Sequence, residues 1–497
     1  MALEVLSLTF DPITLLTILV GVTAGISIGA MPGLTSTMGI ALLMPLTFAM
    51  EAHTGMMLLI GEFVGAIYGG SITAILINTP GTPSAAATVL DGYPFTKRGE
   101  SGRAIGISTV ASFGGGIISG IIMILVAPVL ANIALKFSAP ETFALAFFGI
   151  SIISSISGKS LLKGLFSGAI GLTLALIGVD NITGFTRFAF GSTFLMGGLA
   201  VIPVMVGLFA MSQCFLSIEE LEATNVITQK IKSALPTKQD LKTIWPTILR
   251  GGLTGTFIGI IPGAGGDISA FVSYDMERRV SKHPELFGTG LPEAIAAPES
   301  SNNGTTGGAL IPLLTLGIPG DSNTAVMLGA LMIHNLIPGP MLFVQQAAVV
   351  DTLFIGFMIA NVFMLILGLL GIPLFVKIVQ VPRKILVPVI IVLCLVGSYA
   401  INNNYLDVVV MLVAGVIGYA LVKGGFPLSP IVLALILGPM AEGNLRRSLV
   451  MSKGSVMIFF ERPISAAFIV IAVVCLFLPI IKRWIVMYRN FKKSSAA

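Results

Sequence analysis

The sequence predicts an all-α polytopic membrane protein, built from two repeated halves that contain broken or re-entrant helices. Three observations predict this fold: the composition, the succession of apolar runs and an internal repeat. Of the 497 residues, 55% are apolar and 10% are charged, and the mean hydropathy is +0.98. Soluble proteins carry about a quarter charged residues. The composition therefore excludes a soluble enzyme, a nucleic-acid-binding protein and a disordered scaffold.

Apolar runs follow one another along almost the whole chain. At about 20 residues per crossing, this length allows roughly ten to fourteen crossings of a lipid bilayer. The runs lie at 13–30, 38–50, 55–78, 104–133, 140–156, 161–179, 194–217, 244–261, 305–318, 324–344, 351–376, 384–400, 404–422, 428–440 and 463–481. Those at 38–50, 305–318 and 428–440 are too short to cross, and we expect half-helices or re-entrant segments there.

Basic clusters separate these runs, and the net charge is +5. Because Lys and Arg accumulate in cytoplasmic loops, we expect the clusters on the cytoplasmic side. The predicted organisation is a first membrane repeat at 1–216, a polar cytoplasmic linker at 217–243, a second membrane repeat at 244–481 and a basic cytoplasmic tail at 482–497. The cysteines and histidines are scattered without metal-ligand spacing, so neither a metal site nor a cofactor is expected.

The internal repeat begins with a glycine pattern that ends in Pro-Gly. Residues 21–34 read GVTAGISIGAMPGL, and residues 251–264 read GGLTGTFIGIIPGA, so four glycines and one proline coincide at an offset of 230 residues. Coincidence is the alternative, but over all offsets such a match is expected by chance only on the order of 10⁻² to 10⁻³ times. The match favours a duplication.

A second match follows in the same order. Gly-Gly at 69–70 leads to Pro-Gly at 80–81, and Gly-Gly at 307–308 leads to Pro-Gly at 319–320. The offset is now 238, rising to 239, so the second half has a longer insertion between its two motifs. We expect the two halves to be inverted in topology, as in many secondary transporters.

Each Pro-Gly pair predicts a helix break. Proline and glycine end a helix and leave backbone groups without partners, which lipid does not tolerate unless they line a protein-enclosed cavity. Transporters use such groups to hold anions and Na⁺. The alternative is that each pair only kinks a helix for packing. The predicted helix-break residues are Pro32, Pro80, Pro262 and Pro319.

The residues beside the breaks are small and rich in oxygen. Hydroxyls, amides and carboxylates suit Na⁺, whereas helix N-termini and hydroxyls suit a carboxylate substrate. No Arg or Lys lies in these segments. The candidate substrate- and ion-binding residues are Gly33, Thr35, Ser36, Thr37, Asn78, Thr79, Gly81, Thr82, Ser84, Gly263, Gly265, Gly266, Asp267, Gly320, Asp321, Ser322, Asn323 and Thr324.

Asp267 and Asp321 are acids beside apolar runs, and Glu62 is a further candidate inside one. An acid inside the membrane is a functional hypothesis in itself. Alternatively, Asp267 and Asp321 cap helices in water at the membrane surface. The polar stretch Ala297–Gly304 is too polar to face lipid, so it either lines the site or forms a loop.

Enzyme motifs are incomplete. Gly158-Lys159-Ser160 lacks the first glycine of a phosphate-binding loop, which would stand at position 153. An intramembrane aspartyl protease has a Tyr-Asp pair, found at 274–275, but also a GxGD motif, and both Gly-Asp candidates lack its first glycine. The chain is therefore interpreted as a transporter rather than an enzyme, with the protease as a weak alternative.

With these residues in view, the chain resembles the large membrane subunit of the tripartite tricarboxylate transporters, the TctA family. The resemblance covers nearly the whole chain. The segments that carry it are GISIGAMPGL (25–34), YGGSITAILINTPGTPSAAATVLDGYP (68–94), IIPGAGGDISAFVSYD (260–275), APESSNNGTTGGALIPLLTLGIPG (297–320), AVMLGALMIHNLIPGP (325–340) and GFPLSPIVLALILGPMAEGNLRRSL (425–449).

The resemblance implies a multi-pass transporter of the bacterial inner membrane. Its partners would be a small TctB-like membrane subunit and a periplasmic TctC-like solute-binding protein. An Na⁺ or H⁺ gradient would drive the uptake of citrate, other tricarboxylates, dicarboxylates or aromatic carboxylates. No site residue carries over from the family, so the candidates above rest on the breaks. A stand-alone ion-coupled carrier without a binding protein and, more weakly, a channel are the alternatives.

Overall fold

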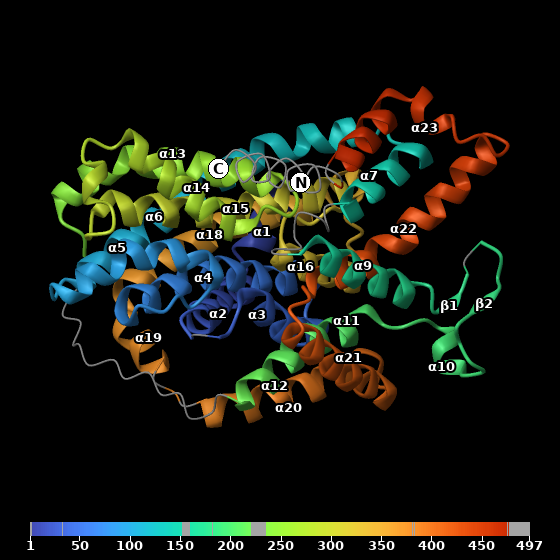
Figure 1. The fold of residues 1–497 in the computed structure, drawn as a ribbon, viewed down its shortest axis with the longest axis horizontal. Coiled ribbons are helices and arrows are strands. Elements are labelled where there is room, and N and C mark those ends of the chain that lie inside the picture. The colour runs from blue at the N-terminus through green and yellow to red at the C-terminus, as the bar shows by residue number, and fades with distance from the viewer. Residues whose placement is uncertain are drawn as a thin grey trace, which may run out of the picture. The chain divides into compact units, whose positions relative to one another are not determined.

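The computed structural model describes residues 2–31, 33–151, 160–180, 182–219, 235–379, 381, 383–474 and 476. Part of the predicted linker, the predicted basic tail, the Gly158-Lys159 pair and Pro32 lie outside these residues. The described chain forms two compact units, one made of residues 1–134 and 205–419 and the other of 135–204 and 420–497. Figure 1 shows that almost all of it is helical, as predicted.

The first unit contains most of the helices. They are α1 (Ala2–Thr9), α2 (Pro12–Gly29), α3 (Ser36–Leu43), α4 (Ala52–Ile77), α5 (Ala86–Lys97), α6 (Ser101–Ala134), α12 (Ser212–Glu219), α13 (Lys238–Ile260), α14 (Gly265–Val280), α15 (Pro292–Leu316), α16 (Ser322–Ile333), α17 (Pro340–Gln345), α18 (Ala347–Leu370), α19 (Ile372–Val379), α20 (Arg383–Asn402) and α21 (Tyr405–Lys423). Short 3-10 helices η1 (Met44–Ala49), η2 (Pro83–Ala85) and η4 (Pro284–Leu286) and the π-helix η3 (Val206–Met211) connect them.

The second unit is smaller. Its helices are α7 (Ala139–Ser151), α9 (Leu161–Ala175), α10 (Thr193–Met196), α11 (Val201–Met205), α22 (Ser429–Met451), α23 (Ile458–Glu461) and a final helix at Pro463–Val474. Strands β1 (Gly178–Val179) and β2 (Thr186–Arg187) pair antiparallel in a short hairpin (Figure 1).

Seven helical segments of the described chain are long and apolar enough to cross a membrane. They are Pro12–Gly29, Ala52–Ile77, Ser101–Ala134, Val201–Glu219, Ala347–Leu370, Lys384–Asn402 and Tyr405–Lys423. The chain is therefore an all-α polytopic membrane protein.

Two of the three short apolar runs are parts of long helices, so the expectation of half-helices was wrong there. The run at 305–318 belongs to α15, and the run at 428–440 belongs to α22, which have 25 and 23 residues. In α15, the polar stretch Ala297–Gly304 continues the helix because it is buried against other helices and not exposed to lipid. The loop interpretation of that stretch was also wrong. Only the run at 38–50 forms a short helix, α3, followed by η1.

The glycine repeat builds two equivalent helix pairs within the first unit. A Cβ added at Gly25 of α2 would overlap the carbonyl oxygen of Glu62 of α4, and one added at Gly255 of α13 would overlap that of Ser301 of α15. These contacts follow the sequence offsets of 230 and 239 residues. Glycine lets the two backbones touch, so α2 packs on α4 in the same way as α13 packs on α15 (Figure 1).

Candidate functional site

The first break of each half follows the first helix of its pair. Helix α2 ends at Gly29 and α3 begins at Ser36, and Gly33 between them has φ +92°. In the second half, Gly263 separates α13 from α14 and has φ +81°. Glycine adopts these left-handed angles without the strain of a side chain, so the same residue turns the chain at both places.

The second break of each half packs onto the end of the first helix. Gly81 lies against the carbonyl oxygen of Gly29, and its N–H donates to the oxygen of Gly70 at 3.1 Å. Gly320 lies in the same way against the carbonyl oxygen of Gly259. The oxygen of Gly320 also accepts from the N–H of Gly263 at 2.7 Å. The two breaks of each half therefore lie side by side.

The breaks of the two halves also touch each other. Thr37 Oγ1, in the first turn of α3, donates to Asn323 Oδ1, in the first turn of α16, at 2.7 Å. A second contact joins the first break of the second half to the second break of the first half. A Cβ added at Gly266 of α14 would lie 3.3 Å from the Cβ of Ser84. Residues of all four breaks therefore converge within the first unit.

Three of the candidates have capping or backbone roles. Gly33 is exposed, and its carbonyl accepts from Gln213 Nε2 at 2.7 Å. Thr35 caps α3 by accepting from the N–H of Met38. Asn78 is the exposed C-cap of α4 with φ +57°. Thr35 and Asn78 are therefore capping residues, and the carbonyl of Gly33 is bound by a side chain of α12.

The two acids beside the breaks differ in their surroundings. Asp321 is the N-cap of α16 and accepts from the N–H and the Oγ1 of Thr324 at 2.8 and 2.7 Å. Asn323 Nδ2 donates to the same carboxylate at 3.0 Å. Asp267 is exposed in the first turn of α14, close enough to Asp321 for their charges to repel. The capping interpretation therefore applies to Asp321, next to a second negative charge.

Glu62 and Asn302 are buried polar side chains that pack against the helices following the breaks, and neither has a hydrogen-bond partner. Glu62 of α4 is 0% exposed, and neither of its carboxyl oxygens is hydrogen-bonded. Asn302 of α15 is also 0% exposed, and both ends of its amide lack partners. Glu62 lies against α3, next to Gly39, and Asn302 lies against Gly266 of α14. Each therefore lies on the second helix of its pair, facing the helix that follows the first break.

Sequence reasoning did not include Asn302 among the candidates. The available signal was the polar stretch Ala297–Gly304 between apolar segments. The same stretch supplies Glu299, whose carboxylate accepts from the hydroxyls of Thr88, Ser108 and Ser112. These three donors satisfy Glu299, in contrast to Glu62. Among the residues that the structure describes, no group of three or more His, Cys, Asp or Glu side chains could hold a metal.

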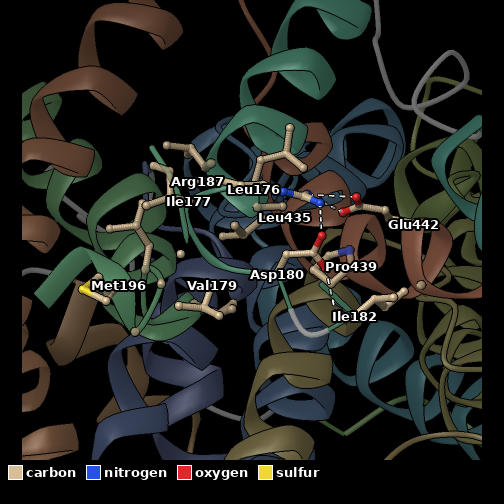
Figure 2. A pocket seen from close by; sticks show the side chains of 18 residues that line it. Leu176, Ile177, Val179, Asp180, Ile182, Arg187, Met196, Leu435, Pro439 and Glu442 are labelled. Atoms are coloured by element: carbon tan, nitrogen blue, oxygen red, sulfur yellow. Dashed lines mark hydrogen bonds and ion pairs between the residues drawn. The ribbon is translucent and has the colours of Figure 1, made fainter. Parts of the chain in front are cut away.

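The second unit contains a cavity of about 340 Å³, lined by residues from 174–201 and 435–443. Figure 2 shows Arg187 joined to Glu442 and to Asp180 at its edge. The N–H of Ile182 and the Arg446 guanidinium hold the pKa of Asp180 well below its usual range. None of the candidates from the sequence lies in this cavity.

Comparison with known proteins identifies the family. The model of the tripartite tricarboxylate transporter TctA family matches residues 15–433. The chain belongs to the TctA family. An uncharacterised 52.8 kDa protein of the TAR-I ttuC′ 3′ region of Agrobacterium vitis is 37% identical over 474 residues, which are 95% of this chain and 94% of that protein. An uncharacterised protein of the TAR-II ttuC′ 3′ region of the same organism is 37% identical over 227 residues, which are 46% of this chain and 94% of that protein. No solved structure matches.

Membership in the TctA family has two direct consequences. The family is one of transporters, so the chain is a multi-pass membrane transporter and not an enzyme. The weak protease interpretation of Tyr274 and Asp275 is therefore wrong. The family also supplies the large membrane subunit of a tripartite system, which is the resemblance that the sequence motifs indicated.

Proposed function

We propose that this TctA protein takes up small carboxylates across the bacterial inner membrane, driven by an Na⁺ or H⁺ gradient. A periplasmic TctC-like binding protein delivers the substrate, and a small TctB-like subunit completes the membrane complex. The substrate class comprises citrate and other tricarboxylates, dicarboxylates and aromatic carboxylates. One part of the protein that carries the breaks moves relative to the rest, which gives alternating access.

The observation that carries this proposal is the meeting of breaks from both halves. Thr37 contacts Asn323, and Gly266 contacts Ser84, so the N-termini of α3, α14 and α16 lie together with the η2 segment. Helix N-termini attract anions. The unpartnered amide of Asn302 beside Gly266 adds a donor that a substrate carboxylate can use.

Charge at this place favours co-binding of a cation. Asp267 and Asp321 lie close to each other beside the N-terminus of α14, and the break segments contain neither Lys nor Arg. A carboxylate substrate entering alone would be repelled by both acids. A cation held between the acids and the substrate removes this repulsion, so substrate and ion bind together.

Uptake in proteoliposomes tests the proposal. The TctA and TctB-like subunits are reconstituted, and labelled citrate, a dicarboxylate and an aromatic carboxylate are supplied with and without an Na⁺ gradient, a proton gradient and the binding protein. We expect uptake that requires both a gradient and the binding protein. Gradient-driven uptake without the binding protein would indicate a stand-alone carrier. Flux that neither saturates nor follows a gradient would indicate a channel.

A further inference from the structure

We propose that the carboxyl group of Glu62 binds and releases a proton during the transport cycle, at the contact between α3 and α4. This inference rests on the proposed function, since the proton is one that moves together with the substrate. It adds a site that lies outside the polar segments next to the Pro-Gly pairs.

The first support is the isolation of the carboxyl group. Glu62 lies in the middle of α4, 0% exposed, and neither oxygen accepts a hydrogen bond. A charged carboxylate without donors is far less stable in such surroundings than the neutral acid. The geometry therefore suits the protonated form, and acids buried in this way within membrane helices recur in proton-coupled transporters.

The second support is an unpartnered hydroxyl that faces this group. Ser36, the first residue of α3, interacts with the carboxyl of Glu62, yet the hydroxyl is buried and completes no hydrogen bond. Gly39, one turn further along α3, lies directly against Glu62 Oε1. The carboxyl group is thus enclosed between its own helix and the helix that follows the first break.

No charged side chain of the described helices that pack on α4 pairs with the Glu62 carboxyl. Helices α2 and α3 carry no titratable side chain. The other helices that pack on α4 carry Asp351 on α18, Asp91, Tyr93 and Lys97 on α5, Arg103 on α6, and Glu293 and Glu299 on α15, and helix α4 itself carries His53 and Tyr68. None of these interacts with the Glu62 carboxyl, for which Ser36 is the polar side-chain neighbour among the described residues.

The same surroundings favour a proton over a metal cation. Hard cations in proteins are typically surrounded by six or more oxygen ligands, whereas a proton needs one. Glu62 and Ser36 provide one carboxyl group and one hydroxyl. When the proton leaves, the carboxylate needs hydrogen-bond donors, and α3 offers the Ser36 hydroxyl and the N–H groups of its first turn, which lack partners within the helix. A small shift of α3 supplies them, so proton release is linked to movement of the first break.

The first test measures proton entry with a pH-sensitive dye inside proteoliposomes. Substrate addition should acidify the lumen in the wild type. We expect Glu62→Gln to reduce this acidification at least tenfold while substrate counterflow stays within threefold, because Gln keeps the shape of the side chain. Glu299→Gln is the matched control, since Glu299 is equally buried but satisfied by three hydroxyls. Unchanged acidification in Glu62→Gln, or counterflow without acidification in the wild type, would overturn the proposal.

The second test uses the wild-type protein, so its outcome does not depend on whether a variant folds. Dicyclohexylcarbodiimide reacts with protonated carboxyl groups in apolar surroundings, and mass spectrometry locates the adduct. We expect labelling of Glu62 that decreases as the pH rises, and Glu299 serves as the internal comparison. Absence of labelling at every pH would contradict the proposal. If the wild type gives neither uptake nor counterflow, the proposed function fails, while this labelling still decides whether Glu62 exchanges a proton.

Discussion

Thr37 donates a hydrogen bond to Asn323, which lies 286 residues later in the chain, at 2.7 Å. The two residues lie in the first turns of α3 and α16, the helices that follow the first break of one half and the second break of the other. This bond joins the two repeats at the place where the backbone is interrupted. A change at either end should therefore affect transport more than it affects folding.

Removal of the Thr37 hydroxyl should slow uptake. Thr37→Val keeps the shape and deletes one hydrogen bond, which contributes about 1 kcal/mol, so we expect an uptake rate about 3- to 10-fold lower. Thr243→Val is the control, because Thr243 is not among the candidates and its hydroxyl donates to the carbonyl of Gln239 on its own helix, α13. Equal uptake by the two variants would show that the contact between the halves has no role in transport.

Alanine at the equivalent glycines should destabilise both helix pairs. Gly25→Ala and Gly255→Ala would each place a methyl group on a backbone carbonyl oxygen, which cannot move aside as a side chain can. We expect each to lower the free energy of unfolding by about 1–3 kcal/mol, measured by thermal unfolding in detergent. Gly443→Ala is the control, since a Cβ there meets nothing within 4 Å. Stability equal to that of the control in both Gly25→Ala and Gly255→Ala would contradict the close backbone contact within the two helix pairs.

Asp321 and Asp267, the two acids beside the breaks of the second half, should contribute differently to stability. Asp321→Ala removes the N-cap of α16 and should cost about 1 kcal/mol of stability, whereas Asp267→Asn should leave stability unchanged because Asp267 is exposed. Both Asp267→Asn and Asp321→Asn should weaken the dependence of uptake on Na⁺, since charge is lost and volume is kept. Normal Na⁺ dependence in both variants would refute an ion role for these acids.

Acid should weaken the anchor at the start of α13. Asp240 is hydrogen-bonded to Arg103 at 2.9 and 2.6 Å and to the N–H and hydroxyl of Thr237. Arg103, followed by Thr237, lowers the pKa of Asp240 to about 2 despite burial. A lowered folded-state pKa gives stability that is complete above the unfolded-state pKa of about 3.9. This stability is lost as the pH falls from there through the folded-state pKa.

Asp240→Asn is the variant that tests this anchor. Its unfolding temperature should be lower than that of the wild type at pH 7 and should depend less on pH below 4. Parallel unfolding curves over the acid range would contradict a stabilising role for the Asp240 charge.

Local chemistry made part of this protein predictable. Pro-Gly pairs in apolar runs predict helix breaks wherever they occur, and the spacing of Gly21, Gly25 and Gly29 predicts a flat helix face. Glu62 was conspicuous because an acid in an apolar run needs a reason. The fold class and the existence of breaks follow from such features, which depend on a few adjacent residues.

The remaining features depend on packing between segments that lie far apart in the sequence, so local sequence patterns do not predict them. Asn302 faces Gly266 only because α15 packs on α14, and its sequence neighbourhood reads equally well as a loop. Helix α15 continues through polar residues because protein, and not lipid, surrounds them. Asp180 meets Arg446 across 266 residues of sequence, and no local pattern indicates that pair.

A reversible crosslink between Thr37 and Asn323 tests whether transport requires movement where the breaks of the two halves meet. Thr37→Cys and Asn323→Cys, in a background without the native cysteines, are joined by a short bifunctional thiol reagent with a cleavable disulfide, and labelled carboxylate uptake is measured before and after reduction. We expect the crosslinked protein to transport at less than a tenth of the rate measured after reduction, and we expect reduction to restore uptake. Equal uptake with the crosslink in place would contradict a transport site formed where the breaks of the two halves meet.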